Sequence, residues 1–106
     1  MNIEGKTALV TGGAKRIGRG ITLALARAGA NVVINYNNSA NEASATATEA
    51  ETLGVEALPI KANVADYDAV GTMVDEAVRR FGTIDILVNN ASLFVCLLYT
   101  SDAADE

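Results

Sequence analysis

Four short apolar runs, rich in β-branched residues, recur along the 106-residue chain. They are "KTALVT" (Lys6–Thr11), "NVVINY" (Asn31–Tyr36), "VEALPI" (Val55–Ile60) and "IDILVNN" (Ile84–Asn90). Such runs, with little alternation of apolar and polar residues, are typical of strands that a parallel sheet buries on both faces. The pattern therefore predicts four parallel strands.

The segments between these runs predict helices. In the first and third segments, apolar residues recur close to the 3.6-residue helical period, so each helix should cover the sheet with one face. The predicted buried faces are Ile17, Ile21, Ala24, Leu25 and Ala28 in the first segment, and Val70, Val74, Ala77, Val78 and Phe81 in the third.

Helix-end signals mark the same segments. Ser39 and Glu42 have the spacing of a capping box, in which each side chain binds the other residue's free backbone N–H. The carboxylate of Asp66 suits the start of the third helix. Each helix then meets a glycine that we expect in the left-handed conformation that ends a helix. These glycines are Gly29, Gly54 and Gly82.

Strands and helices thus alternate in the order β-α-β-α-β-α-β. Because crossovers between parallel strands are right-handed, this order predicts an α/β fold with a wound parallel sheet and the strand order 3-2-1-4. The prediction is a Rossmann-type doubly wound sheet of which residues 1–95 form only the N-terminal half.

A glycine-rich stretch, "VTGGAKRIGRG" (Val10–Gly20), joins the first strand to the first helix. Such a loop faces the ligand crevice, where the free N–H groups of the helix N-terminus favour a pyrophosphate. Gly12 would allow a tight turn, and Gly18 would let the helix pack closely on the sheet. Lys15 and Arg16 would add positive charge for a further phosphate. The alternative is an ordinary β-to-α turn with solvated basic residues.

The loop resembles that of the short-chain dehydrogenase/reductase family, which runs Thr-Gly, three residues, Gly, one residue, Gly. Here it reads "TGGAKRIG" (Thr11–Gly18), with Arg16 where the family has its middle glycine. In this respect the chain is similar to pteridine reductases and to bacterial proteins close to 3-oxoacyl-carrier-protein reductases. The loop residues that the resemblance assigns to a dinucleotide are Gly12, Lys15, Arg16, Ile17 and Gly18.

Two further segments extend the resemblance to about residues 3–95. "NNAS" (Asn89–Ser92) is similar to the family's Asn-Asn-Ala-Gly, and "ANVAD" (Ala62–Asp66) to the segment after its third strand. An asparagine pair after a strand is otherwise an ordinary turn. The positions that the resemblance implies are Asn63 and Val64 beside the adenine, and Asn90 and Ala91 beside the ribose.

The end of the second strand indicates which nicotinamide cofactor binds. Proteins that bind NAD place an acidic side chain there, which accepts hydrogen bonds from the ribose hydroxyls. This chain has Tyr36 instead, followed by the uncharged Asn37, Asn38 and Ser39. With Lys15 and Arg16 opposite, these side chains favour the 2′-phosphate of NADP(H). Alternatively, residues 37–39 form only a polar turn and a helix cap.

The resemblance also implies catalytic residues that this sequence does not contain. Family members continue into a catalytic asparagine, a serine and a Tyr-x-x-x-Lys helix, in which the tyrosine is the general acid or base. Tyr99 has no lysine four residues later, and no lysine follows Lys61. We therefore assign no catalytic residue here and expect the 106-residue chain to be inactive and marginally stable.

These observations predict half of an NADP(H)-dependent reductase that transfers hydride to a small carbonyl substrate, similar to 3-oxoacyl-carrier-protein reductases. A pteridine reductase is the enzymatic alternative. A non-catalytic NADP-binding module is the alternative of another class, and it would need a cover for the outer edge of the fourth strand. The resemblance also implies a homo-oligomeric parent protein.

Composition excludes several other functions. The chain is 50% hydrophobic, and its 8 basic and 13 acidic residues give a net charge of −5. This charge disfavours a nucleic-acid partner. Without an apolar run of membrane-spanning length or a signal peptide, a membrane partner is not expected and the predicted location is the cytoplasm. Without histidine and with the single Cys96, we predict neither a metal site nor an internal disulfide.

The last residues, "CLLYTSDAADE" (Cys96–Glu106), fit no element of the predicted fold. They resemble the translation of a transposon end joined to a sequencing adapter. We therefore predict that residues 96–106 are a non-native tail. A natural acidic tail is the alternative. Without its acidic residues, Asp102, Asp105 and Glu106, the excess of acidic over basic residues falls from five to two.

Overall fold

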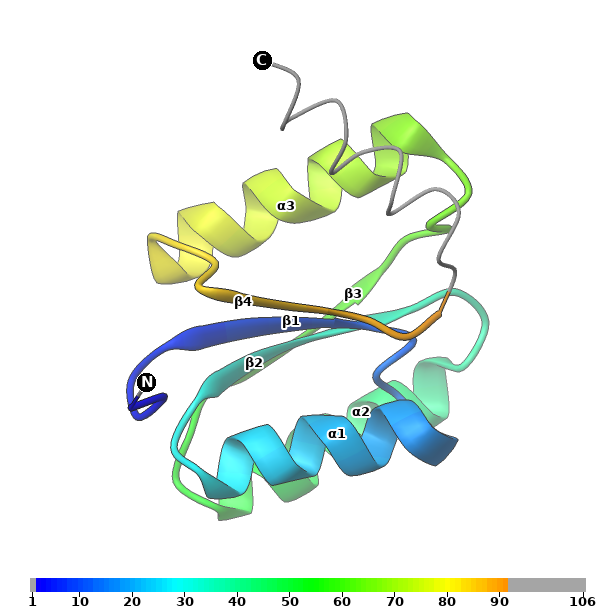
Figure 1. Cartoon of the computed structure of the whole chain (residues 1–106). Helices are drawn as coiled ribbons and strands as arrows, with labels where there is room; N and C mark the ends of the chain where they lie inside the picture. The colour runs from blue at the N-terminus through cyan, green and yellow to red at the C-terminus, as the bar shows by residue number, and fades with distance from the viewer. Residues whose placement is uncertain (1, 92–106) are drawn as a thin grey trace.

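The computed structural model describes residues 2–91. The predicted non-native tail, residues 96–106, lies outside the described residues. Strands and helices alternate along the chain, as predicted (Figure 1). The elements are β1 (Thr7–Thr11), α1 (Arg16–Arg27), β2 (Asn31–Tyr36), α2 (Ala40–Thr52), β3 (Ala57–Lys61), α3 (Tyr67–Phe81) and β4 (Ile86–Asn89).

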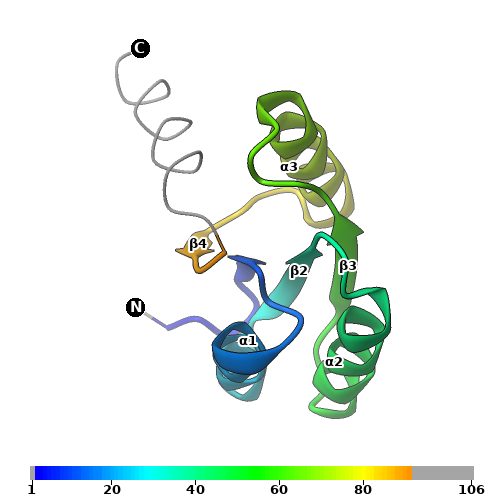
Figure 2. The same ribbon diagram turned by 90° about the vertical axis from the view of Figure 1, so that its right-hand side faces the viewer.

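The strands form one parallel sheet in the order β3-β2-β1-β4, which confirms the predicted topology. In the central pairings, Val10 of β1 lies opposite Ile34 of β2 and Val88 of β4. Helices α1 and α2 cover one face of the sheet and α3 the other (Figure 2). The described part of the chain therefore has the three-layer, doubly wound arrangement of a Rossmann-type fold.

Strands β3 and β4 each begin two residues later than predicted, at Ala57 and Ile86. Pairing decides both boundaries, because Ala57 is the first β3 residue opposite β2 and Ile86 the first β4 residue opposite β1. The apolar residues Val55 and Ile84 precede these pairings. Both are partly buried and pack against the core from the loops.

The core lies on both faces of β2. Val32 and Ile34 face α1 and α2, where they pack against small residues such as Ala43 and Ala47. Val33 lies on the other face, in a cluster that includes Met73 of α3. All three β2 side chains are fully buried, as predicted for a central parallel strand.

The predicted buried face of α1 is wrong for three of its five residues, Ile17, Ala24 and Ala28, which are exposed. Ile17 is 74% exposed. The helix meets the sheet through Gly18 instead, whose close approach to the preceding loop fixes the rotation of the helix. The residues that α1 buries are Gly18, Thr22, Leu23 and Ala26.

The predicted face of α3 needs a smaller correction. Val70 and Ala77 are buried and Val74 is partly buried, as expected. Val78, however, is 40% exposed, and Met73 is fully buried in the core. The long, flexible methionine side chain fills the space against the sheet, so the buried stripe is centred one residue away from the one predicted.

The helix ends agree with the sequence except at Ser39. Asp66 caps α3, because its carboxylate accepts hydrogen bonds from the backbone N–H groups of Asp68 and Ala69 at 3.0 and 3.3 Å. Ser39 occupies the N-cap position of α2 but makes no capping hydrogen bond, so the predicted capping box with Glu42 is wrong. Ser39 lines a pocket instead. The predicted left-handed glycines are confirmed at Gly29, Gly54 and Gly82, with φ of +96°, +95° and +85°.

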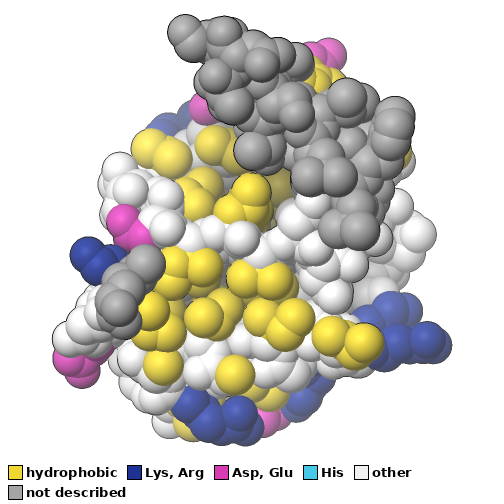
Figure 3. All heavy atoms as spheres, viewed as in Figure 1, with side chains coloured by type: hydrophobic (Ala, Val, Ile, Leu, Met, Phe, Trp, Pro, Cys, Tyr) yellow, Lys and Arg dark blue, Asp and Glu magenta, His cyan; other side chains and the backbone are white. Residues whose placement is uncertain are grey.

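Within residues 2–91, strand β4 pairs with β1 on one side only. Its Leu87 side chain is 50% exposed, and hydrophobic side chains gather on the surface that carries β4 in this view (Figure 3). An open edge beside apolar surface is a known aggregation hazard. Among the described helices, none is long and apolar enough to cross a membrane.

Candidate functional site

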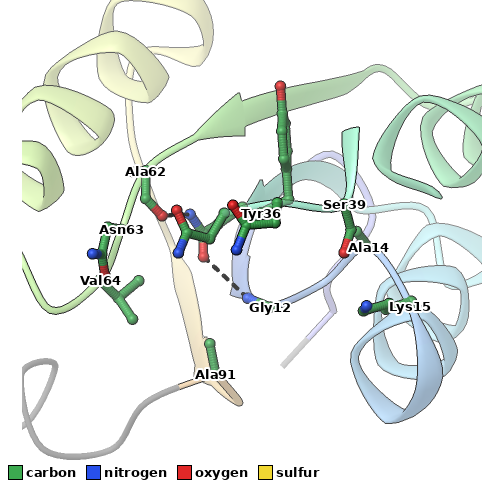
Figure 4. A pocket seen from close by; sticks show the side chains of 12 residues that line it. Gly12, Ala14, Lys15, Tyr36, Ser39, Ala62, Asn63, Val64 and Ala91 are labelled. Atoms are coloured by element: carbon green, nitrogen blue, oxygen red, sulfur yellow. Dashed lines mark hydrogen bonds between the residues drawn. The ribbon is translucent and has the colours of Figure 1, made fainter. Parts of the chain in front are cut away.

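A cavity of about 370 Å³ lies at the carboxyl ends of the strands. It opens where the chain order reverses across the sheet, which is where open α/β sheets bind their ligands. Every strand contributes through the residues that follow or end it (Figure 4). The lining residues are Gly12, Ala14, Lys15, Asn35, Tyr36, Asn37, Asn38, Ser39, Ala62, Asn63, Val64 and Ala91.

The glycine loop (residues 12–15) leads from β1 into α1, and its close packing against α1 requires glycine at Gly12 in the loop and at Gly18 in the helix. Gly12 has φ of +61°, and a Cβ there would lie 2.8 Å from the Cβ of Ala91. A Cβ on Gly18 would lie 1.8 Å from the carbonyl oxygen of Gly12. The predicted roles of these glycines, a tight turn and close helix packing, agree with this geometry.

Two basic residues flank the start of α1. Lys15 is the N-cap, with extended backbone and no capping hydrogen bond from its side chain. Arg16 follows with φ of +57°, and it alone among the described non-glycine residues has a positive φ. That conformation costs an arginine roughly 1–2 kcal/mol more than the right-handed one. Both side chains are exposed, so their charges reach the solvent beside the cavity.

Asn35 connects the glycine loop to β3 from the end of β2. Its Oδ1 accepts a hydrogen bond from the Gly12 N–H at 3.1 Å, and its Nδ2 donates to the carbonyl oxygen of Ala62 at 3.0 Å. Its own carbonyl oxygen accepts from the Gly13 N–H at 3.0 Å. Only 2% of Asn35 is exposed. This buried amide therefore fixes the loop relative to two strands.

A second set of hydrogen bonds joins the end of β4 to the loop. The Thr11 hydroxyl oxygen accepts from the N–H groups of Asn90 and Ala91 at 2.8 and 3.1 Å. Asn90 Nδ2 donates to the carbonyl oxygen of Gly12 at 3.1 Å. The asparagine pair is therefore more than a polar turn, because it holds the glycine loop from the β4 side.

The cavity carries positive charge on one side and neutral polar groups on the others. Lys15 and Ser39 lie across from Asn63 and Val64, with Gly12 between them (Figure 4). Lys15 is the charged residue among those that line the cavity, and no acidic side chain accompanies it there in residues 2–91. Farther along α1, Arg19 forms an ion pair with Glu49 of α2. The cavity thus suits an anion that also carries an apolar or aromatic part.

The structure brings most of the predicted site residues together around this cavity. Those that line it are Gly12, Lys15, Tyr36, Asn37, Asn38, Ser39, Asn63, Val64 and Ala91. Four predicted residues are not in the lining: Arg16, Ile17, Gly18 and Asn90. Gly18 and Asn90 contact Gly12 of the loop without lining the cavity. The side chains of Arg16 and Ile17 are exposed near the loop.

Three lining residues were not predicted: Ala14, Asn35 and Ala62. The signal for Asn35 was present in the sequence, since it is a polar side chain directly after the apolar residues 32–34 of the central strand. Buried polar side chains are almost always hydrogen-bonded, so such a residue indicates a specific partner. For metals, the residues that the structure describes contain no group of three or more His, Cys, Asp or Glu side chains placed to hold an ion.

The strand order and the glycine loop at the switch point define a Rossmann-type α/β domain. A sequence profile described as "short chain dehydrogenase" matches residues 6–105. The chain therefore belongs to the short-chain dehydrogenase family.

Reductases from other organisms that are similar in sequence support this assignment. The chain is 49% identical over 88 residues to 3-oxoacyl-(acyl-carrier-protein) reductase FabG of Staphylococcus aureus, covering 83% of this chain and 36% of that protein. It is 44% identical over 91 residues to versicolorin reductase stcU of Emericella nidulans, covering 86% and 34%. The chain thus spans about a third of the length of these curated relatives.

Solved structures show the same fold. A short chain dehydrogenase from Burkholderia cenocepacia in complex with NADP matches with a TM-score of 0.88 and 36% identity, covering all of this chain and 52% of that one. A dehydrogenase/reductase from Sinorhizobium meliloti matches with a TM-score of 0.83 and 41% identity, covering 87% and 36%.

Proposed function

We propose that this chain forms the adenosine-binding half of an NADP(H) site in a reductase that transfers hydride between the nicotinamide and a carbonyl carbon. One observation carries the proposal: the glycine loop, which ends in Lys15, lines the same cavity as the end of β2, and no acidic side chain is present at that end of β2. The similar short chain dehydrogenase from Burkholderia cenocepacia, whose structure is a complex with NADP, supports the choice of cofactor.

Each part of the cofactor has a complementary part of the cavity. The pyrophosphate lies against the glycine loop at the N-terminus of α1, where free N–H groups favour an anion. Asn63 and Val64 flank the adenine, and Asn90 and Ala91 lie beside a ribose of the cofactor. Gly12 in the loop and Ile17 and Gly18 at the start of α1 shape the phosphate end of the site.

The 2′-phosphate distinguishes NADP(H) from NAD(H). We place it between Lys15 and Arg16 on one side and the β2 end on the other. There, Tyr36, Asn37, Asn38 and Ser39 present neutral polar groups, and Ser39 is free of a capping bond. A carboxylate at Tyr36 would repel this phosphate. The left-handed backbone of Arg16 is a strained feature at the proposed site, as often found where a residue serves binding.

The cofactor supplies the hydride when bound. The chain's own residues would hold its adenosine end, and the Tyr-x-x-x-Lys pattern of the family does not occur in the 106-residue sequence. We therefore propose that the acid-base groups belong to a part of the protein beyond these residues and that the chain alone is inactive. The proposed substrate is a 3-oxoacyl group on a carrier, on the basis of the FabG relative.

Replacing Lys15 with alanine tests the cofactor assignment. We expect the affinity for NADP⁺ to fall about tenfold, because a charge-assisted contact to the 2′-phosphate is lost. Affinity for NAD⁺, which lacks that phosphate, should change less than about twofold. Isothermal titration calorimetry of the 106-residue chain at low ionic strength gives both dissociation constants, since salt screens exposed charges.

The matched control is Lys6→Ala, which removes a lysine at the opposite end of β1 from the cavity. This control should bind both nucleotides as the wild type does. An equal loss of NADP⁺ and NAD⁺ affinity in Lys15→Ala would show that Lys15 does not recognise the 2′-phosphate. Failure of the folded wild type to bind either nucleotide would refute the proposed function.

A further inference from the structure

The carbonyl oxygens of three consecutive loop residues each accept a hydrogen bond from a side chain of a different segment. None of the three donor residues lines the cavity, so each of these oxygens is directed toward a partner outside the cavity lining. The pairs are Gly12 with Asn90 Nδ2 at 3.1 Å, Gly13 with the Thr22 hydroxyl at 3.0 Å, and Ala14 with the Thr46 hydroxyl at 2.8 Å. The Thr22 hydroxyl also lies 2.9 Å from the carbonyl oxygen of Gly18, so Gly13 shares this donor, whereas Ala14 is the one acceptor for the Thr46 hydroxyl among the described residues.

The bond from Thr46 is unusual for a helical threonine. A threonine within a helix commonly donates to the carbonyl four residues earlier. Thr48, its neighbour on α2, does so with Ser44 at 3.0 Å, and Thr72 of α3 does so with Asp68 at 3.1 Å. The Thr46 hydroxyl donates instead to Ala14, which lies 32 residues away in the chain.

Both residues of this hydrogen bond are buried, so its loss would leave the carbonyl of Ala14 without a partner. Thr46 is 0% exposed and Ala14 is 2% exposed, so water does not readily replace the hydroxyl. A buried carbonyl without a partner is unfavourable. Ala14 lines the cavity, whereas Thr46 does not. If the hydroxyl were lost, the carbonyl of Ala14 could find a new partner by turning toward the water in the cavity.

Such a turn would move the neighbouring N–H group as well. In a trans peptide the C=O and the following N–H point in opposite directions, so the carbonyl of Ala14 sets the direction of the Lys15 N–H. With the carbonyl fixed toward α2, this N–H points away from α2 at the N-cap of α1. A carbonyl turned into the cavity would instead present a partial negative charge to a phosphate.

We propose that Thr46 is a positioning residue that holds the Ala14–Lys15 peptide in the orientation a dinucleotide phosphate requires. It acts through Ala14 and touches no ligand itself. This inference rests on the proposed function, because it assigns a role in binding the same cofactor. It differs from the role of Lys15, since the peptide faces the pyrophosphate that NADP(H) and NAD(H) share.

The test compares Thr46→Val with Thr46→Ser by calorimetric titration of NADP⁺ and NAD⁺ into the 106-residue chain. Valine keeps the shape of threonine but has no hydroxyl, whereas serine keeps the hydroxyl. We expect Thr46→Val to bind both nucleotides about tenfold more weakly, with an unchanged NADP⁺ to NAD⁺ ratio. Thr46→Ser should bind as the wild type does. Thr48→Val is the control, because its hydroxyl bonds only within α2.

Circular dichroism establishes that each variant is folded before titration. If Thr46→Val does not fold, Thr46→Cys replaces it, because a thiol is a weak donor of similar size, and at least about threefold weaker binding is expected. A folded variant without the hydroxyl that keeps wild-type affinity would overturn the proposal, because a purely structural threonine alters only stability. If the folded wild type binds neither nucleotide, the proposed function fails and the role of Thr46 fails with it.

Discussion

Replacing Gly18 with alanine is expected to destabilise the fold by at least about 3 kcal/mol, a large share of the stability of a domain of this size. The added Cβ would lie 1.8 Å from the carbonyl oxygen of Gly12 and 2.8 Å from the Asn90 side chain. Backbone cannot yield as a flexible side chain can, so α1 would have to move away from the sheet. Urea denaturation followed by far-ultraviolet circular dichroism measures the loss.

Gly20→Ala is the matched control on the same helix. Apart from the backbone of α1 itself and the neighbouring residues, no atom lies within 4 Å of a Cβ at Gly20, so the substitution fits without displacement. Because alanine favours helix over glycine, we expect this variant to gain up to about 1 kcal/mol. If Gly18→Ala unfolds at the same urea concentration as the wild type, α1 does not approach the glycine loop as closely as described.

Replacing Asn35 with leucine should have the next largest effect, a loss of about 2–5 kcal/mol in the free energy of unfolding. Leucine is similar in size but can neither accept from the Gly12 N–H nor donate to the carbonyl oxygen of Ala62. Both backbone groups would be left without partners at the base of the cavity. Asn35→Asp should also lose stability, because a carboxylate can accept from Gly12 but cannot donate to Ala62 and brings a charge into a buried site. The same urea titrations measure these changes.

Asn31→Leu controls for the removal of an amide from the same strand. Asn31 lies at the other end of β2, where its Oδ1 accepts from the exposed Glu56 N–H at 2.9 Å. Water can replace that bond, so we expect a loss below about 1 kcal/mol. Equal losses for Asn35→Leu and Asn31→Leu would mean that the buried amide does not fix the loop.

The positions and order of the strands and helices could be predicted because strong, local signals in the sequence determine them. Apolar runs locate the strands, the glycines after the helices mark their ends, and right-handed crossovers favour a doubly wound sheet, for which 3-2-1-4 is one common strand order. The buried face of α1 was mispredicted because hydrophobicity does not determine it. The close contact of Gly18 with the loop determines which face of α1 is buried, and it places Ile17 on the surface.

The candidate site was predicted where a family motif marks it, in the glycine loop and after β2, β3 and β4. Its supporting residues were missed, since their partners are distant in sequence. Asn35 contacts a residue 27 positions away, and Thr46 contacts one 32 positions away. Both are polar residues on otherwise apolar buried faces, so the sequence shows that they need partners without showing which ones.

The most direct measurement maps where an adenosine phosphate binds. We would titrate 2′,5′-ADP, which carries the 2′-phosphate, into the ¹⁵N-labelled 106-residue chain and follow the backbone amide resonances. The NADP(H) proposal predicts shifts confined to the glycine loop, to residues 36–39 and to residues 62–64, with smaller shifts for 5′-ADP. Shifts spread over other surfaces, or none at all in the folded chain, would contradict it.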